Sequence, residues 1–312
     1  MKDSKPAVSV VIPTRNRPDL VVRAVRSALE QTFGDLEVVV IIDGPDAATK
    51  AALSKIHDIR LRALELSHSL GGAAARNAGV RAATGEWIAF LDDDDEWLAG
   101  KLARQLEVAH ESEAPEPIIA CRLIASTPSG EYVWPRRIMR ADEHVSEFVM
   151  ARRDLFQGEG LLQTSMLMVR KSLLDQVPFD DQVMRHQEWD WLLRVSRVPG
   201  VQIEFAPEPL LIWYVEQNRS SISNQSNWRY SFDWIRQRRQ LVTERAYAGF
   251  LMTLVTALAA RARDWSAIRP LLTEAVRFGR PDMAQLAVFA GLWLLPTNFR
   301  RRLRRLATSA VL

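Results

Sequence analysis

Short β-branched runs alternate with helical stretches through the first third of this 312-residue chain, and this order constrains the fold more than any other feature. Strands are predicted for residues 7–13, 36–42, 59–66 and 86–91, and helices for residues 19–31, 46–56 and 71–85. Strands and helices of this length in alternation predict an α/β fold, a mostly parallel central sheet with helices on both faces. In such sheets, ligands bind beyond the carboxyl ends of the strands.

Four consecutive aspartates, Asp92, Asp93, Asp94 and Asp95, follow the strand at 86–91. Their mutual repulsion requires a compensating cation, either a metal ion or the protein's own arginines. Neighbouring side chains of an extended segment point to opposite sides, so Asp92 and Asp94 can share one side and offer hard oxygen ligands to Mg²⁺ or Mn²⁺. The alternative is a solvated acidic loop in which Asp95 caps the following helix.

The composition is that of an ordinary globular protein, with 47% hydrophobic and 25% charged residues. Cys121 is the only cysteine, which excludes an internal disulfide and favours a reducing compartment. The N-terminus lacks the apolar core of a secretory signal, and the apolar run at 286–296 is too short to span a bilayer. We therefore expect a cytoplasmic protein without a transmembrane helix.

Two regions are predicted along the chain. Residues 1–225 are predicted to form one domain, with halves at about 1–115 and about 116–225. Residues 226–312 are predicted to form a helical C-terminal region.

Several motifs occur in the order and at the spacing typical of one enzyme family. They are the strand ending in "IPTRN", Asp43 after the second strand, "RNAG" at 76–79, "GEW" at 85–87 and "LDDDD" at 91–95. This pattern resembles family 2 of the inverting glycosyltransferases, which have the GT-A fold. The resemblance covers residues 7 to about 110 and, with fewer motifs, extends to about 225. It implies that residues 1–225 are a catalytic domain, with a nucleotide-sugar half at about 1–115 and an acceptor half at about 116–225.

The resemblance implies a metal-dependent inverting glycosyltransferase of polysaccharide or cell-envelope glycan synthesis. It would use Mg²⁺ or Mn²⁺ to move a sugar from a nucleotide-sugar donor, a UDP-sugar, to a glycan or lipid-linked glycan. The alternative is a catalytically silent relative that binds nucleotide sugars or scaffolds a membrane-associated assembly. A dinucleotide-dependent oxidoreductase is set aside, because the glycine-rich stretch at 71–79 lacks the Gly-x-Gly-x-x-Gly pattern.

The donor-site residues are carried over position by position. Asp43 matches the aspartate that contacts the nucleotide base, although this chain has Ile42 where the family usually has a second acid. Asp94 matches the direct metal ligand, and Asp92 is expected to contribute to the metal and ribose sites. The other donor-binding positions implied by the match are Thr14, Arg15, Arg76, Asp93 and, in the loop at 216–223, Arg219.

Inverting transfer also needs a base that removes a proton from the acceptor hydroxyl. In the family this base is an aspartate on a helix, and the corresponding helix here reads "HQEWDW", with Glu188 at the catalytic position. The alternative role for Glu188 is a charge on the helix surface. Asp190 is expected to fix the local structure.

The C-terminal region joins an apolar helix to a tail with five arginines. Three interpretations remain open: peripheral contact with an anionic membrane, a helix packed on the catalytic domain, or a protein contact such as a homodimer. Nucleic acid is not an expected partner, because no basic groove with interleaved aromatic residues accompanies the tail.

Overall fold

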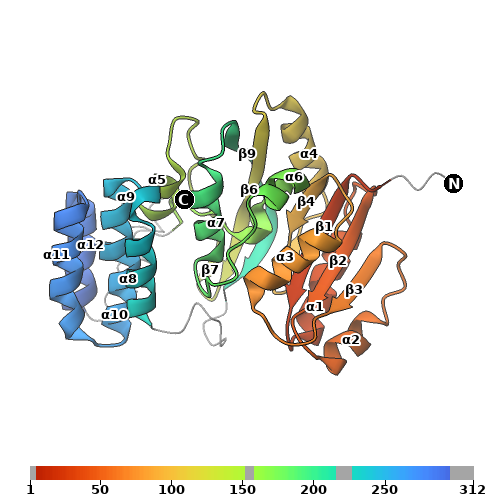
Figure 1. Ribbon diagram of the computed structural model, residues 1–312, viewed down its shortest axis with the longest axis horizontal. Coiled ribbons are helices and arrows are strands. Elements are labelled where there is room, and N and C mark those ends of the chain that lie inside the picture. Colours follow the sequence, from red (N-terminus) through yellow and green to blue (C-terminus); the bar gives the residue numbers. More distant parts are fainter. Residues whose placement is uncertain (1–4, 152–157, 216–226, 296–312) are drawn as a thin grey trace. The chain divides into compact units, whose positions relative to one another are not determined.

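The computed structural model describes residues 5–151, 158–215 and 227–295, which belong to two compact units (Figure 1). The first unit comprises Met1–Ala141 and Leu162–Asn218, and the second comprises Asp142–Leu161 and Arg219–Leu312. The segment at 142–161, which the sequence places in the acceptor half, thus belongs with the C-terminal helices. One contact connects this segment to the C-terminal helices: the Thr243 hydroxyl donates a hydrogen bond to the Glu147 carboxylate at 3.0 Å.

The N-terminal half of the first unit is the predicted α/β alternation. Four parallel strands lie in the order β3-β2-β1-β4, namely β1 (Val8–Thr14), β2 (Leu36–Ile42), β3 (Leu61–Glu65) and β4 (Trp87–Phe90). The helices are α1 (Pro18–Leu29), α2 (Ala47–Leu53) and α3 (Gly72–Ala82). Pro18 starts α1 with a preset helical φ, and the Asp46 carboxylate caps α2 by accepting from the Thr49 backbone N–H.

Both faces of this half-sheet are covered by helices. Val39 and Ile41 of β2 pack against Ala75 of α3, and alternation along the strand turns Ile42 to the opposite face, near Leu53 of α2. Helix α3 lies so close to the sheet that a Cβ on Gly79 would come within 2.3 Å of Val11. The predicted α/β fold with two covered faces is confirmed, and small residues on α3 allow its close packing.

The second half of the sheet departs from the predicted parallel arrangement. The order continues β4-β8-β6-β9-β5, with β7 paired to β6. Only β6 and β9 run parallel here; the pairs β4–β8, β6–β8, β6–β7 and β5–β9 are antiparallel, so the whole sheet is mixed. The strands are β5 (Asp95–Trp97), β6 (Glu116–Thr127), β7 (Gly130–Trp134), β8 (Met168–Arg170) and β9 (Val201–Tyr214).

Two local features of this half concern β9. Residues 201–214 form one long strand, whose register against β6 shifts where Pro207 and Pro209 lie. The alternative in which Asp95 caps a helix is wrong. Asp95 belongs to β5, where it pairs with Trp213 of β9, and α4 begins at Lys101 after Gly100. The remaining elements of this unit are α4 (Lys101–Glu111), α6 (Lys171–Gln176), α7 (Gln187–Val195) and the 3₁₀ turn η1 (Thr164–Met166).

In the described residues of the second unit, the regular secondary structure is all helical. Helix α9, the π-helical segment η4 and α10 follow one another without a break, and Thr243 caps their start. No helix in the described part of the chain is long and apolar enough to cross a bilayer. The elements are α5 (Val145–Met150), α8 (Trp228–Gln237), η3 (Arg239–Leu241), α9 (Glu244–Gly249), η4 (Phe250–Val255), α10 (Thr256–Arg261), η5 (Trp265–Ala267), α11 (Ile268–Phe278) and α12 (Met283–Leu294).

Candidate functional site

Polar side chains gather at the carboxyl edge of the parallel strands. Strand β1 ends at Thr14, β2 ends immediately before Asp43, and β4 leads into the four aspartates. Because these strands are parallel neighbours, their carboxyl ends lie at one edge of the sheet. Thr14 connects two of these ends directly, since its hydroxyl donates to the Asp93 carboxylate at 2.8 Å.

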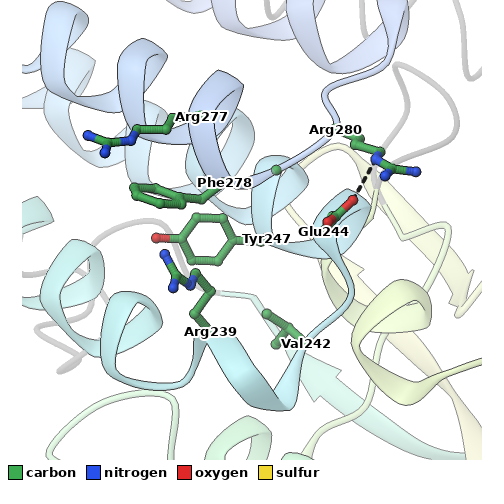
Figure 2. A pocket seen from close by; sticks show the side chains of 8 residues that line it. Arg239, Val242, Glu244, Tyr247, Arg277, Phe278 and Arg280 are labelled. Carbon is green, nitrogen blue, oxygen red and sulfur yellow. Dashed lines mark ion pairs between the residues drawn. The ribbon is translucent and has the colours of Figure 1, made fainter.

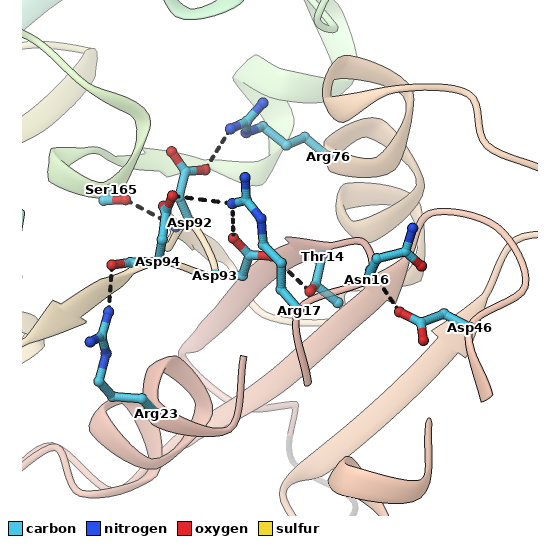
Figure 3. Close-up of polar contacts among 10 residues, drawn as sticks. All are labelled: Thr14, Asn16, Arg17, Arg23, Asp46, Arg76, Asp92, Asp93, Asp94 and Ser165. Carbon is cyan, nitrogen blue, oxygen red and sulfur yellow. Dashed lines mark hydrogen bonds and ion pairs between the residues drawn. The ribbon is translucent and has the colours of Figure 1, made fainter. Parts of the chain in front are cut away.

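Three arginines compensate the aspartates (Figure 3). Arg17 donates to the carboxylates of Asp93 at 2.8 Å and Asp94 at 3.1 Å. Arg23 donates to the Asp94 backbone carbonyl at 2.6 Å, and Arg76 pairs with Asp92 at 2.5 Å. The protein's own arginines therefore neutralise much of the negative charge of the four aspartates. This was one of the two sources of compensation that the sequence left open.

Burial alternates along the acidic segment, although Asp93 and Asp94 form a turn rather than the expected extended backbone, closed by the Asp95 N–H donating to the Asp92 carbonyl. Asp93 and Asp95 are buried, whereas Asp92 and Asp94 are half-buried. Burial raises the pKa of Asp93 to about 6 against the opposing charge of Arg17, and burial also raises the pKa of Asp95. The pair with the greater access to solvent, Asp92 and Asp94, is the pair to which the sequence assigned the metal.

Asp43 anchors the loop that precedes α3. Its carboxylate accepts hydrogen bonds from the Ser69 hydroxyl and the Leu70 backbone N–H, both at 2.7 Å, and from the Gly71 N–H at 3.0 Å. Arg15 donates to the same Ser69 hydroxyl. The structure thus links the predicted residues Arg15 and Asp43 through Ser69, which was not predicted from the sequence.

Arg76 connects the acidic edge to the helix that carries the predicted base. Its guanidinium pairs with Asp92 and also donates to the Gln187 side chain at 2.9 Å. Glu188 is the next residue of α7; burial raises the pKa of its half-buried carboxyl, and the nearby charge of Arg76 opposes that shift. Asp190 points elsewhere and pairs with Arg194 at 2.8 Å, in agreement with its expected structural role.

The acidic edge can be compared with what a divalent cation needs. Within the described ranges, no group of three or more histidine, cysteine, aspartate or glutamate side chains is arranged to hold a metal. Asp92 and Asp94 nevertheless supply the hard carboxylate oxygens that suit Mg²⁺ or Mn²⁺, which commonly bind through one or two carboxylates and share the substrate's phosphates. Their chemistry fits such an ion, and Arg17 and Arg76 form ion pairs with these two carboxylates.

Several residues of the site were not identified from the sequence. They are Arg17, Arg23, Ser69, Ser165 and Gln187. For Arg17 there was a usable signal: it directly precedes Pro18, the first residue of a helix that begins at the same sheet edge as the aspartates. For Gln187 and Ser165 the sequence carries no such signal, because their hydrogen-bond partners lie more than 70 residues away along the chain. Arg219 lies outside the described residues.

A family model described as "Glycosyl transferase family 2" matches residues 9–177. Among curated proteins, the amylovoran biosynthesis glycosyltransferase AmsB of Erwinia amylovora is 26% identical over 79% of this chain and 84% of its own length. A GalNAc(5)-diNAcBac-PP-undecaprenol β-1,3-glucosyltransferase of Campylobacter jejuni is 30% identical over 60% of this chain and 59% of its own length.

Two solved structures share the fold at low identity. TarS of S. aureus in complex with UDP-GlcNAc aligns with a TM-score of 0.55 and 14% identity, over 96% of this chain and 92% of that one. The mannosyltransferase PcManGT of Pyrobaculum calidifontis, in complex with GDP-Man and Mn²⁺, aligns with a TM-score of 0.52 and 19% identity, over 99% and 81%. At these identities the likeness concerns the fold alone.

Arg17 is expected to stabilise the folded protein through its charge. Replacing Arg17 by methionine should lower the free energy of unfolding by about 1–3 kcal/mol at neutral pH, because the buried Asp93 carboxylate loses its partner. The pKa of Asp93 is higher in the folded protein than its ordinary value, so the carboxylate becomes protonated and the loss shrinks as pH falls through about 6. Denaturant unfolding at neutral and mildly acidic pH measures both effects.

The matched control adds Asp93→Asn to Arg17→Met. Asparagine keeps an acceptor for Thr14 but removes the uncompensated charge, so the double variant should recover most of the stability that the single variant loses. An equal loss in both variants would show that Arg17 acts through packing rather than charge.

Proposed function

Because the chain belongs to glycosyl transferase family 2, we propose that it moves a sugar from a UDP-sugar to a glycan or lipid-linked glycan acceptor, with inversion at the transferred carbon. The observation that carries the proposal is the bridge made by Arg76. This one guanidinium contacts Asp92, at the edge proposed to bind the donor, and Gln187, the neighbour of the proposed base. Donor and acceptor chemistry would then meet across a single buried side chain.

The donor half of the proposal rests on Asp43 and the acidic edge. Asp43 and Arg15 hold the 69–71 loop beside the ends of β1 and β2, where the nucleoside would bind. The diphosphate would lie over Asp92 and Asp94, where Arg17 and Arg76 supply positive charge to its oxygens. A divalent ion held by Asp94 and Asp92 would supply Lewis-acid stabilisation of the leaving diphosphate.

Glu188 is the proposed general base. A carboxylate whose pKa is raised by burial is a better proton acceptor than a solvated one, provided that it is ionised at the working pH. Arg76 favours the ionised form, and its contacts with Asp92 and Gln187 fix where that positive charge lies. The raised pKa of Glu188, and the contact by which Arg76 links the neighbouring Gln187 to Asp92, support this role.

One of the relatives supports an acceptor at the membrane. The C. jejuni relative acts, by its name, on an undecaprenol-linked glycan. Helix α12 of this chain is apolar and exposes Met283, Ala287, Ala290 and Leu294, whose spacing places them along one face, with Met283 80% and Leu294 76% exposed. We propose that this face contacts the membrane surface during transfer to a lipid-linked acceptor.

Nucleotide and metal use can be tested by thermal stability with UDP, GDP, dTDP and CDP, each with and without Mn²⁺. Saturation at 100 times Kd should add about 2.7 kcal/mol to the free energy of unfolding. We expect the largest shift with UDP and Mn²⁺, and its loss in Asp94→Asn, which keeps the side-chain shape but removes the charge. A shift of equal size without Mn²⁺, or one retained in Asp94→Asn, would contradict the proposed metal site.

The base is tested by Glu188→Gln, which should lower kcat by about 100- to 10,000-fold while donor binding by calorimetry is unchanged. Glu188→Asp is the matched control, because it keeps a carboxylate and introduces the aspartate typical of the family. This variant should retain part of the activity. If transfer survives in Glu188→Gln, the assignment of the base is wrong. If the unaltered protein binds donor but neither transfers nor hydrolyses it, the catalytically silent alternative is favoured.

Membrane contact by α12 is tested by cosedimentation with anionic vesicles. Leu294→Asp should lower vesicle affinity by about tenfold or more, because a buried leucine contributes roughly 1.5–3 kcal/mol. Val276→Asp on α11, where Val276 is 59% exposed, makes a similar change away from α12 and should have less effect. Equal loss in both variants would indicate that added charge, rather than the α12 face, weakens binding.

A further inference from the structure

The helical unit contains a pocket of about 500 Å³ whose lining is rich in arginine (Figure 2). It lies between the segment that joins α8 to α9 and the C-terminal end of α11. Arg239, Arg277, Phe278 and Tyr247 gather on one side, and the Glu244–Arg280 ion pair lies on the other. The lining residues are Arg239, Val242, Glu244, Tyr247, Arg277, Phe278, Gly279 and Arg280.

Two of these arginines share an aromatic ring instead of a carboxylate. The guanidinium carbons of Arg239 and Arg277 lie 4.3 and 5.0 Å from the centre of the Phe278 ring. Within the described part of the chain, neither has a carboxylate partner.

Neighbouring arginines differ in this respect. Arg236 pairs with Glu274 at 3.5 Å, and Arg245 pairs with Asp282 at 2.9 Å. The Tyr247 hydroxyl also donates to Glu274, at 2.7 Å, so this carboxylate is already engaged beside the pocket. Of the arginines that line the pocket, Arg239 and Arg277 are therefore the two without a carboxylate partner among the described residues.

The arrangement at Phe278 is suited to binding an anion. A guanidinium over a ring face keeps its in-plane N–H donors available at its edges, because the aromatic contact uses only its flat face. Two such cations on one ring repel each other, and an anion placed near both would reduce the repulsion. Arg280 can add a third donor, since its ion pair with Glu244 is solvent-exposed and such pairs are weak.

We propose that this pocket binds a phosphate or diphosphate group through Arg239 and Arg277. Arginine forks match the several oxygens of a phosphoryl group, and the lining carries three arginines against one glutamate. The volume lies within the range of about 300–1,000 Å³ that is usual for small-molecule sites, which leaves space beside Tyr247 and Phe278 for the remainder of the ligand. The proposal is independent of the proposed transferase activity.

The test is calorimetric titration of the full chain with pyrophosphate at physiological ionic strength. EDTA is present throughout, so that no divalent ion can recruit pyrophosphate to the aspartates of the other unit. The pocket variant is Arg239→Met/Arg277→Met, in which methionine retains apolar contact with Phe278 and the fold is checked by melting temperature. We expect saturable binding that is weakened about tenfold or more in this variant, because charge-assisted hydrogen bonds are lost.

The matched control is Arg261→Met/Arg269→Met. It removes two exposed arginines from the same unit, one at the end of α10 and one on α11, and neither lines the pocket. Pyrophosphate affinity should be unchanged in this control. Equal weakening in the control and pocket variants would overturn the proposal, because it would show that net charge alone attracts the anion.

The source of the phosphoryl group is resolved with vesicles of phosphatidylcholine, with and without phosphatidic acid. Binding that requires phosphatidic acid, is displaced by pyrophosphate and is lost in the pocket variant would identify a lipid headgroup. Pyrophosphate binding without such competition would identify a soluble phosphorylated ligand. If neither pyrophosphate nor phosphatidic acid binds in a manner that depends on Arg239 and Arg277, the pocket is not a phosphate site.

Discussion

The pairing of arginines with four consecutive aspartates is the interaction on which the rest of the site depends. A strand end with this density of negative charge would be unstable in a folded protein without nearby cations. Arg23 lies on α1, Arg17 directly precedes that helix, and Arg76 lies on α3, so residues on or next to two helices that pack on the parallel strands neutralise the acidic edge. The same arginines would be in place for the anionic donor proposed above.

Arg76 extends this arrangement from the parallel half of the sheet to the mixed half. Its second contact, with Gln187, ties α7 to the acidic edge, and α7 carries Glu188. This buried cation binds the Asp92 carboxylate and the side-chain amide of Gln187, which directly precedes Glu188. This explains why the proposed donor and base residues, about 100 positions apart in the sequence, occupy one region of the first unit.

The elements that could be predicted are those whose signal is local. Strands β1, β2 and β4 are apolar runs of the expected length, and α1 and α3 carry their own start signals in Pro18 and Gly71. Asp43 and the acidic segment could be located because strand ends are visible in sequence. The antiparallel pairs around β8, the continuous β9 and the place of Asp95 in β5 were missed, because each depends on a partner strand remote in sequence.

The sequence by itself determined the α/β class, the edge at which polar residues meet and the membership of a glycosyltransferase family, because periodicity and motif spacing are carried by contiguous residues. Only the tertiary structure decided which cations balance the aspartates, that Ser69 links Arg15 to Asp43, and that residues 142–161 belong with the C-terminal helices. It also brought Arg239 and Arg277 to one ring. Charge compensation and packing depend on residues that are close in space but far apart in the sequence. A pattern of contiguous residues does not reveal which of them will meet.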